Sequence, residues 1–141
     1  MKPNAINYLS LAKKGGGIEI GVESAGAAAR ACHARLLLVA KDAPDGALRR
    51  ARNFVAGSGQ QLAVVPFSKE ELGAALGKSV VSLAAITDPA LALAFLQALE
   101  DPQRYEGALE DLANRTKRVR QRQLEEKAHQ KNLQRGKRRR Q

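Results

Sequence analysis

Three features are scarce in this chain of 141 residues, and each scarcity excludes a class of site. The single cysteine, Cys32, excludes an internal disulfide framework and a metal site built from a cysteine cluster. Aromatic residues make up only 4% of the sequence and tryptophan is absent, so we do not expect a platform of exposed rings on which nucleic-acid bases stack. The core must instead be aliphatic, built from alanine, leucine, valine and isoleucine.

Long apolar segments are missing as well. No apolar run approaches the roughly 20 residues that cross a bilayer. The first residues, 1–4, show no charged region followed by an apolar stretch and a cleavage site, so we expect no signal peptide. The sequence therefore predicts a cytoplasmic protein without a membrane partner.

The charge that is present is concentrated at one end. Residues 1–111 carry 12 lysines and arginines against 12 aspartates and glutamates, whereas residues 112–141 carry 12 against only Glu125 and Glu126. The whole net charge of +10 thus lies in this C-terminal arm. A neutral body with a cationic arm indicates a protein that holds a polyanion, and we favour RNA. Two alternatives stay open: a solvated tail that serves solubility, and contact with a membrane surface, for which the arm lacks a bulky apolar face.

Hydrophobic patterning predicts strands and helices that alternate at short spacing. Apolar runs and one short alternation predict strands at 18–20, 36–40, 62–65 and 80–86. Helices are predicted at 4–14, 24–31, 47–55, 68–76 and 89–99. Asp45, Ser68 and Asp88 are the expected caps. This order predicts an α/β fold, a three-layer α-β-α sandwich with a mixed sheet of about four strands.

We expect one domain over residues 1–101 and a basic extension, helical or disordered, over residues 102–141. Apolar residues at alternating spacings of four and three predict that the extension begins as a helix with a narrow apolar stripe, formed by Tyr105, Leu109, Leu112, Thr116 and Val119. The stripe indicates docking on the body, while dimerisation or a protein partner stays open. Beyond Val119 no adequate apolar face continues, so we expect that half to become ordered on a partner.

Four blocks of sequence carry a resemblance to a known family. They are Leu9–Lys14, Ala34–Ala43 with Gly21 ahead of it, Leu72–Lys78 and Ala84–Asp88. In their order and spacing, these blocks resemble the kink-turn-binding ribosomal protein family (archaeal large-subunit protein L-seven-Ae and eukaryotic L-thirty-e type), and in particular its small bacterial members. The resemblance implies the same sandwich fold and the binding of a structured RNA, and it excludes the arm.

The resemblance also implies where RNA is bound. The loop and helix start after the first strand correspond to Gly21, Val22, Glu23 and Ser24, where glycine lets the backbone come close and Glu23 can accept hydrogen bonds from base amino groups. The wall that would face a flipped-out base consists of Lys78, Ser79, Val80, Val81 and Ser82. We add Lys14 to this predicted set.

Three positions depart from the family's pattern at this helix start. Glu23 stands for an asparagine, Ser24 for a glutamate and Ala27 for a lysine, and small bacterial relatives usually carry a lysine where Gly17 stands. Because one base contact is worth roughly 1–3 kcal/mol, the loss of three can erase sequence specificity. Affinity would then come from phosphate contacts by the arm's cations, which are Arg115, Lys117, Arg118, Arg120, Arg122, Lys127, Lys131, Arg135, Lys137, Arg138, Arg139 and Arg140.

Residue patterns typical of enzymes are missing. Cys32 and His33 are neighbours and point about 100° apart on a helix, so they form no common ligand face. The glycines at 15–17 lack the ending of a phosphate-binding loop. We therefore expect a non-enzymatic protein without metal or cofactor that binds ribosomal RNA or a folded leader RNA, with ribosomal proteins as further partners. The alternative is a protein–protein interaction module of the same fold that has lost kink-turn recognition.

Overall fold

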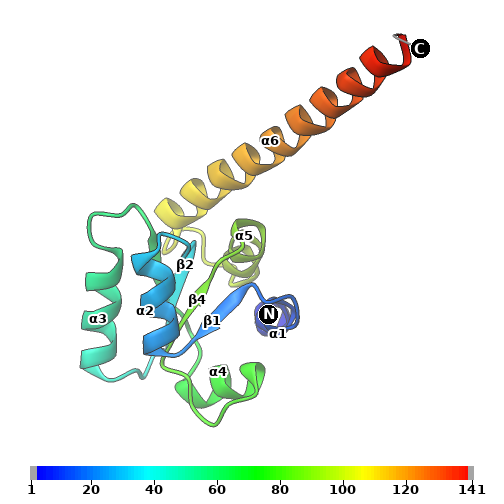
Figure 1. Ribbon diagram of the computed structural model, residues 1–141. Coiled ribbons are helices and arrows are strands. Elements are labelled where there is room, and N and C mark those ends of the chain that lie inside the picture. Colours follow the sequence, from blue (N-terminus) through cyan, green and yellow to red (C-terminus); the bar gives the residue numbers. More distant parts are fainter. Residues whose placement is uncertain (1–2, 140–141) are drawn as a thin grey trace.

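The computed structural model describes residues 3–139, and the side chains of residues 5–133 (Figure 1). It is an α/β fold with a four-stranded mixed sheet, as the sequence predicted. In chain order the elements are α1 (Pro3–Lys14), β1 (Ile18–Ile20), α2 (Val22–Arg30), β2 (Leu36–Val39), α3 (Asp45–Val55), β3 (Gln61–Val64), α4 (Lys69–Leu76), β4 (Leu83–Ile86), α5 (Pro89–Ala98) and α6 (Glu106–Arg139).

The sheet has the strand order β1-β4-β2-β3. Strand β4 is antiparallel to both β1 and β2, while β2 and β3 are parallel. Every residue of the two central strands, β2 and β4, is buried. Their continuous apolar runs are explained by this position, because a central strand that is covered on both faces has no wet side.

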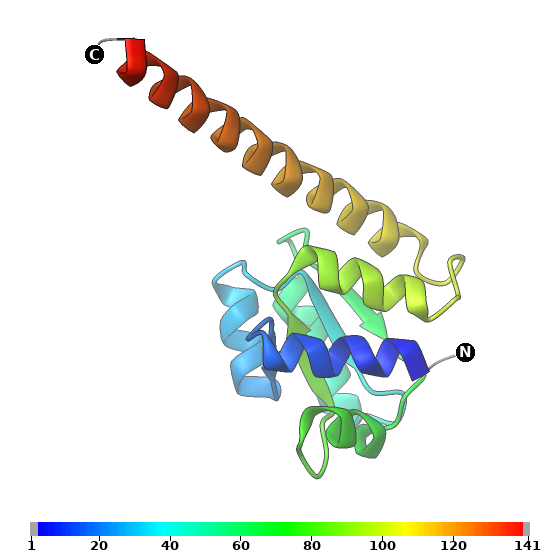
Figure 2. The same cartoon turned by 90° about the vertical axis from the view of Figure 1, so that its right-hand side faces the viewer.

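Helices cover both faces of the sheet (Figures 1 and 2). Leu36 and Leu38 of β2 belong to a cluster with α1, α4, α5 and the start of α6, whereas Leu37 and Val39 belong to a second cluster with α2 and α3. The alternation along one strand thus assigns each side chain to one of two cores. The three-layer α-β-α sandwich is confirmed.

The predicted strand at 80–86 is too long at its beginning, because β4 starts only at Leu83. The preceding residues bond to α4 instead of to a neighbouring strand: the Val81 N–H donates to the Lys69 carbonyl (2.9 Å) and the Lys78 N–H to the Gly73 carbonyl (2.8 Å). A Cβ on Gly73 would lie 2.7 Å from the Lys78 carbonyl oxygen. The absence of a side chain at Gly73 therefore lets residues 78–82 fold back over α4 as a loop.

Two of the three predicted caps are confirmed. Ser68 and Glu71 form a capping box at α4, and the Asp88 carboxylate accepts a hydrogen bond from the Ala90 N–H (3.0 Å) at α5. The predicted cap Asp45 is wrong, because Pro44 occupies the N-cap position of α3 without a side-chain bond. Asp42 serves α4 instead, since its Oδ1 accepts from the Lys69 N–H at 2.8 Å. A sequence pattern cannot show a cap that acts on a helix 27 residues later.

Helix α6 changes character along its length. Tyr105, just before it, and Ala108 and Leu112 belong to the larger core, and Thr116 is buried as well. The predicted intramolecular docking of the stripe is thereby confirmed up to Thr116, whereas Val119 is already 37% exposed. The predicted domain boundary at 101/102 falls in the connection between α5 and α6, so residues on both sides of it contribute to one core.

Two side chains, one just before α6 and one within it, bond to strand β3 and to the loop that precedes this strand. The Tyr105 hydroxyl donates to the Val64 carbonyl at 2.8 Å, and Arg115 Nη2 donates to the Gly59 carbonyl at 3.0 Å. Burial is the main cause that raises the pKa of Tyr105 above its usual value, so the neutral, hydrogen-bonding form of the phenol is favoured. Over residues 3–139, no helix is both long and apolar enough to cross a membrane.

Candidate nucleic-acid interface

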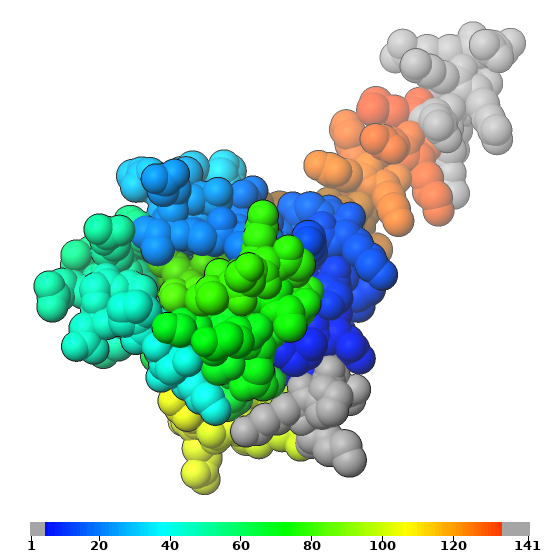
Figure 3. Space-filling model, turned by 90° about the horizontal axis from the view of Figure 1, so that it is seen from below, coloured from blue at the N-terminus to red at the C-terminus, as the bar shows by residue number. Residues whose placement is uncertain are grey.

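The fold brings the two predicted halves of the RNA site to one end of the sheet. The Gly21 N–H donates to the Leu83 carbonyl (2.9 Å), directly after the loop of residues 78–82. The same loop is held from β2, because the Ala40 N–H donates to the Ser82 carbonyl (3.0 Å). Figure 3 shows this end of the molecule, where α4 with its following loop lies between α2 and α1.

The start of α2 is open toward solvent. Gly21 has a φ of +94°, a conformation that side-chain-bearing residues rarely adopt, and it permits the turn from β1 directly into the helix. No side chain caps the first turn, which contains Val22, Glu23 and Ser24. Glu23 and Ser24 are exposed. The free N–H groups favour an anion here, but the Glu23 carboxylate already supplies negative charge and competes with a phosphate.

The facing loop exposes part of the predicted set. Lys78, Ser79 and Val80 are exposed, and Val80 is 50% accessible to solvent. The Val81 side chain lies in the core, so only its backbone remains for a ligand, and Ser82 is half-buried. The loop thus offers one cation and one apolar side chain beside the start of α2.

The two lysines at the end of α1 differ in their hydrogen bonding. Lys13 Nζ donates to the Leu76 carbonyl at 2.6 Å, where it satisfies the C-terminal end of α4. Lys14, which was predicted to bind RNA, is exposed. Lys13 therefore has a structural task that its neighbour does not share.

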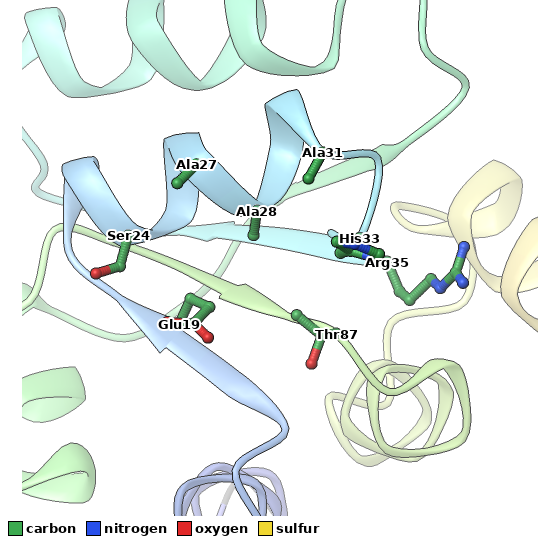
Figure 4. A pocket seen from close by; sticks show the side chains of 8 residues that line it. All are labelled: Glu19, Ser24, Ala27, Ala28, Ala31, His33, Arg35 and Thr87. Atoms are coloured by element: carbon green, nitrogen blue, oxygen red, sulfur yellow. The ribbon is translucent and has the colours of Figure 1, made fainter.

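A hollow of about 600 Å³ lies beside α2 (Figure 4). Its α2 wall consists of Ser24 and three alanines, Ala27, Ala28 and Ala31, while Glu19 and Thr87 approach from the sheet and His33 and Arg35 close one end. The hollow exists because α2 presents only small side chains above the edge strand β1. At Ala27, where the family carries a lysine, a methyl group forms part of the wall.

Polar groups around this hollow do not converge on one point. In Figure 4 the guanidinium group of Arg35 is directed away from the α2 wall, and its Nε is buried without a hydrogen-bond partner among the described residues. Cys32 and His33 are exposed, and Cys32 has a φ of +59°. Within residues 3–139, no group of three or more histidine, cysteine or acidic side chains is placed to hold a metal ion.

The second half of α6 projects from the body as a single helix (Figure 2). Every residue from Lys117 to Leu133 is exposed. Lys117, Arg120, Lys127 and Lys131 follow one another at helical spacing and share one side. The backbone from residue 117 to residue 139 extends about 33 Å at 1.5 Å per residue. The part of the arm that was expected to be unsupported is thus helical in this structure.

The structure leaves part of the predicted arm undescribed. Arg140 lies outside the described residues, and only the backbone is described for Arg135, Lys137, Arg138 and Arg139. Arg118 and Arg122 are exposed like their neighbours.

Arg115 differs from the other cations of the arm. Its Nε lies 2.7 Å from the Asp111 carboxylate and its Nη2 bonds to the Gly59 carbonyl. Arg115 therefore fastens α6 to the loop between α3 and β3. The spacing of four residues between Asp111 and Arg115 was the sequence signal for the ion pair. The contact with Gly59 had no local signal, because 56 residues separate the partners.

Comparisons with known proteins bear on the fold. No protein-family profile and no curated protein matches this sequence. A solved structure of a protein of unknown function from Bacillus halodurans has a TM-score of 0.63 and 18% identity, and covers 69% of this chain and 97% of its own. A 15.5 kD RNA-binding protein from Giardia lamblia has a TM-score of 0.58 and 22% identity, and covers 76% of this chain and 85% of its own. At these identities the comparisons establish a shared fold.

Proposed function

We propose that this chain is a non-enzymatic RNA-binding protein whose body positions a structured RNA and whose projecting helix holds the phosphate backbone. One observation carries the proposal: every residue of α6 between Lys117 and Leu133 is exposed, and this stretch carries six cations against two acids. A helix with little packing is stabilised poorly in water, so a long, exposed and predominantly cationic helix is suited to a polyanionic partner. The Giardia protein that shares this fold is an RNA-binding protein by name, which supports the choice of RNA.

Phosphate neutralisation by α6 explains affinity but not selectivity. Each lysine or arginine that pairs with a phosphate releases counterions from the RNA, which favours binding at low salt. Direction and register would come from the body, where the first turn of α2 and the loop at Lys78–Val80 face the same ligand space. We infer that this end of the sheet contacts a kinked or bulged stem, and that ribosomal or leader RNA supplies such a stem.

Base-specific recognition is the weaker part of the proposed site. At the start of α2, the Glu23 carboxylate can accept from a base amino group and the Ser24 hydroxyl can accept or donate a single hydrogen bond, whereas Ala27 offers no polar atom. Such a site would discriminate between RNAs mainly by shape, which is a common mode of recognition for folded RNA. We therefore propose that a kink-turn is bound through its bent backbone rather than through its bases.

A second candidate function follows from the hollow beside α2. Its alanine wall and the acidic side chain of Glu19 suit a protein segment better than a phosphate. Under this alternative the chain is a protein–protein interaction module. Purification without nuclease separates the two: with two tyrosines and no tryptophan, the protein absorbs weakly, so bound RNA would dominate the spectrum at 260 nm.

The change from buried to exposed residues after Thr116 suggests where to remove the arm. Deletion of residues 117–141 leaves the buried Leu112 and Thr116 in place. We expect this deletion to weaken the binding of structured RNA at least tenfold and to flatten the salt dependence, since each lost contact lowers the slope of log K against log salt by about 0.7–0.9. Fluorescence anisotropy between 50 and 200 mM salt measures both quantities.

A matched variant separates charge from helix length. Replacing all eleven lysines and arginines from Lys117 to Arg140 with glutamine keeps the length of the chain and removes the arm's positive charge, and we expect it to bind like the deletion. Unchanged affinity in both variants would refute the role of the arm. Failure of the intact protein to bind any folded RNA at low salt would refute the proposed function itself.

A further inference from the structure

The neutral body is not electrically uniform. Residues 22–55, which contain α2 and α3, carry six cations against three acids. Residues 100–111, where α5 passes into α6, carry one cation against five acids. A net charge of zero therefore conceals a basic layer, α2 with α3, and an acidic corner where α5 passes into α6, and only the basic layer attracts a polyanion.

Three arginines of α3 form the most basic surface of the body. Arg49, Arg50 and Arg52 are exposed, while Ala51 between them is buried against the second core. Among the described side chains, none of these three guanidinium groups takes part in an ion pair or a hydrogen bond. Three unpaired arginines on one helix leave their donors free for a ligand.

The end of α3 meets the beginning of the projecting part of α6. The loop after α3 contains Gly59, whose carbonyl accepts the hydrogen bond from Arg115 (3.0 Å). In Figure 1 this loop rises to the first turns of α6. Arg118 and Arg122 follow Arg115 by three and seven residues, so they lie on the same side of α6 as the α3 contact.

We propose that Arg49, Arg50 and Arg52 of α3, together with Arg118 and Arg122 of α6, form a second phosphate-binding surface for the backbone of a double-helical RNA stem. The proposal rests on the proposed function and extends it to a surface that lies outside the start of α2 and the loop of residues 78–82. Arginine suits this task because its planar fork donates to two phosphate oxygens at once.

The choice of a double-helical partner follows from rigidity and from the lack of exposed aromatic rings. Two helices that diverge from the corner at Gly59 hold their cations at fixed separations, which suits a stiff ligand with regularly spaced phosphates. Proteins that bind single strands rely on exposed aromatic side chains for stacking. Phe67, Phe95 and Tyr105 are buried here, while Tyr8 is half-buried against the larger core and Phe54 of α3 is half-buried against α2.

The test is the triple variant Arg49→Gln, Arg50→Gln, Arg52→Gln in the full chain, with a hairpin RNA as ligand. We expect affinity at 50 mM salt to fall about 10- to 100-fold and the slope of log K against log salt to fall by about 2, because up to three phosphate contacts are lost. A triple arginine-to-lysine variant at the same positions retains the charge and should keep most of the slope. Thermal unfolding of each variant checks that the fold is intact.

Two controls locate the effect. Arg104→Gln removes one exposed cation from the acidic corner and should change hairpin affinity less than the single variant Arg52→Gln does. Single-stranded RNA of equal length should lose less affinity than the hairpin in the triple variant. Equal losses for both RNAs would overturn the double-helical partner. An unchanged slope in a triple variant whose parent binds the hairpin would overturn the α3 surface and leave the proposed function standing.

Discussion

The two halves of α6 form one continuous helix, yet they obey different physical rules. From Tyr105 to Thr116 the chain carries an apolar stripe, contributes to the core and bonds to the edge of the sheet. From Lys117 onward every described side chain is exposed, and cations outnumber acids by three to one up to Leu133. The difference teaches that the change from a packed to an exposed helix falls after Thr116, inside α6, rather than at the start of the extension.

The largest effect expected from this comparison comes from two truncations. A chain that ends after Asp111 loses Leu112 and Thr116, and the loss of one fully buried leucine alone costs about 2–5 kcal/mol. A chain that ends after Thr116 should unfold with a free energy within about 0.5 kcal/mol of the parent. Urea denaturation measures both, and equal stability of the two truncations would contradict the division at Thr116.

A pair of leucine substitutions makes the same comparison within the full chain. Leu112 is 0% exposed and Leu124 is 63% exposed, on the same helix. We expect Leu112→Ala to lower the free energy of unfolding by about 2–5 kcal/mol, whereas Leu124→Ala should change it by less than about 0.5 kcal/mol. If Leu124→Ala proved as destabilising as Leu112→Ala, the second half of α6 would have to pack against something, such as a second copy.

A smaller effect is expected at the hydroxyl of Tyr105. Tyr105→Phe removes the hydrogen bond to the Val64 carbonyl and should cost about 1 kcal/mol near neutral pH. Burial raises the pKa of Tyr105 in the folded state, so its contribution is fully present below the unfolded pKa of about 10 and is lost as pH rises through the higher folded value.

Urea denaturation of the parent and of Tyr105→Phe at pH 8 and at pH 11 tests this sign. The parent should lose more stability than the variant between these two pH values, because phenylalanine cannot ionise. An equal loss of stability in both proteins would show that ionisation of Tyr105 is not the cause of the loss of stability at high pH.

The smallest effect is expected at the ion pair between Asp111 and Arg115. The two side chains are 34% and 24% exposed, so solvent screens their attraction. We expect Asp111→Asn to lower the free energy of unfolding by no more than about 0.5 kcal/mol, as is usual for pairs four residues apart on a helix. A loss of several kcal/mol would mean that Arg115 depends on Asp111 to hold the loop at Gly59.

Much of this fold could be predicted from the sequence because its determinants are local and periodic. The unbroken apolar run at Leu36–Ala40 predicts a strand covered on both faces. The stripe from Tyr105 to Val119 predicts the docked turns of α6, which extend to Thr116. Where the prediction was wrong, contacts between residues far apart in the sequence determine the local structure. Residues 80–82 look like strand, but the Val81 N–H bonds back to α4, and Asp42 caps a helix that begins 27 residues later.

The candidate site was predicted less completely than the fold. The resemblance named Gly21–Ser24 and Lys78–Ser82, and the structure brings them to one end of the sheet, where the side chain of Val81 faces inward. The hollow beside α2 had no sequence signal, since it results from which element lies above β1. The link between α3 and α6 was equally hidden, because it depends on one side chain that spans 56 residues of sequence.

The long helix contains no glycine between Gly107 and Gly136 and no proline at all. The helix therefore has no glycine or proline hinge between its packed and its exposed turns, and both parts share one axis. A continuous helix fixes the orientation of its outer turns relative to the sheet, whereas a flexible linker would not. A ligand of the outer turns is therefore held in a defined orientation with respect to the sheet. The local concentration of such a ligand near the body then depends on the direction of α6 as well as on its length. A ligand that binds the outer turns in another orientation does not reach the body.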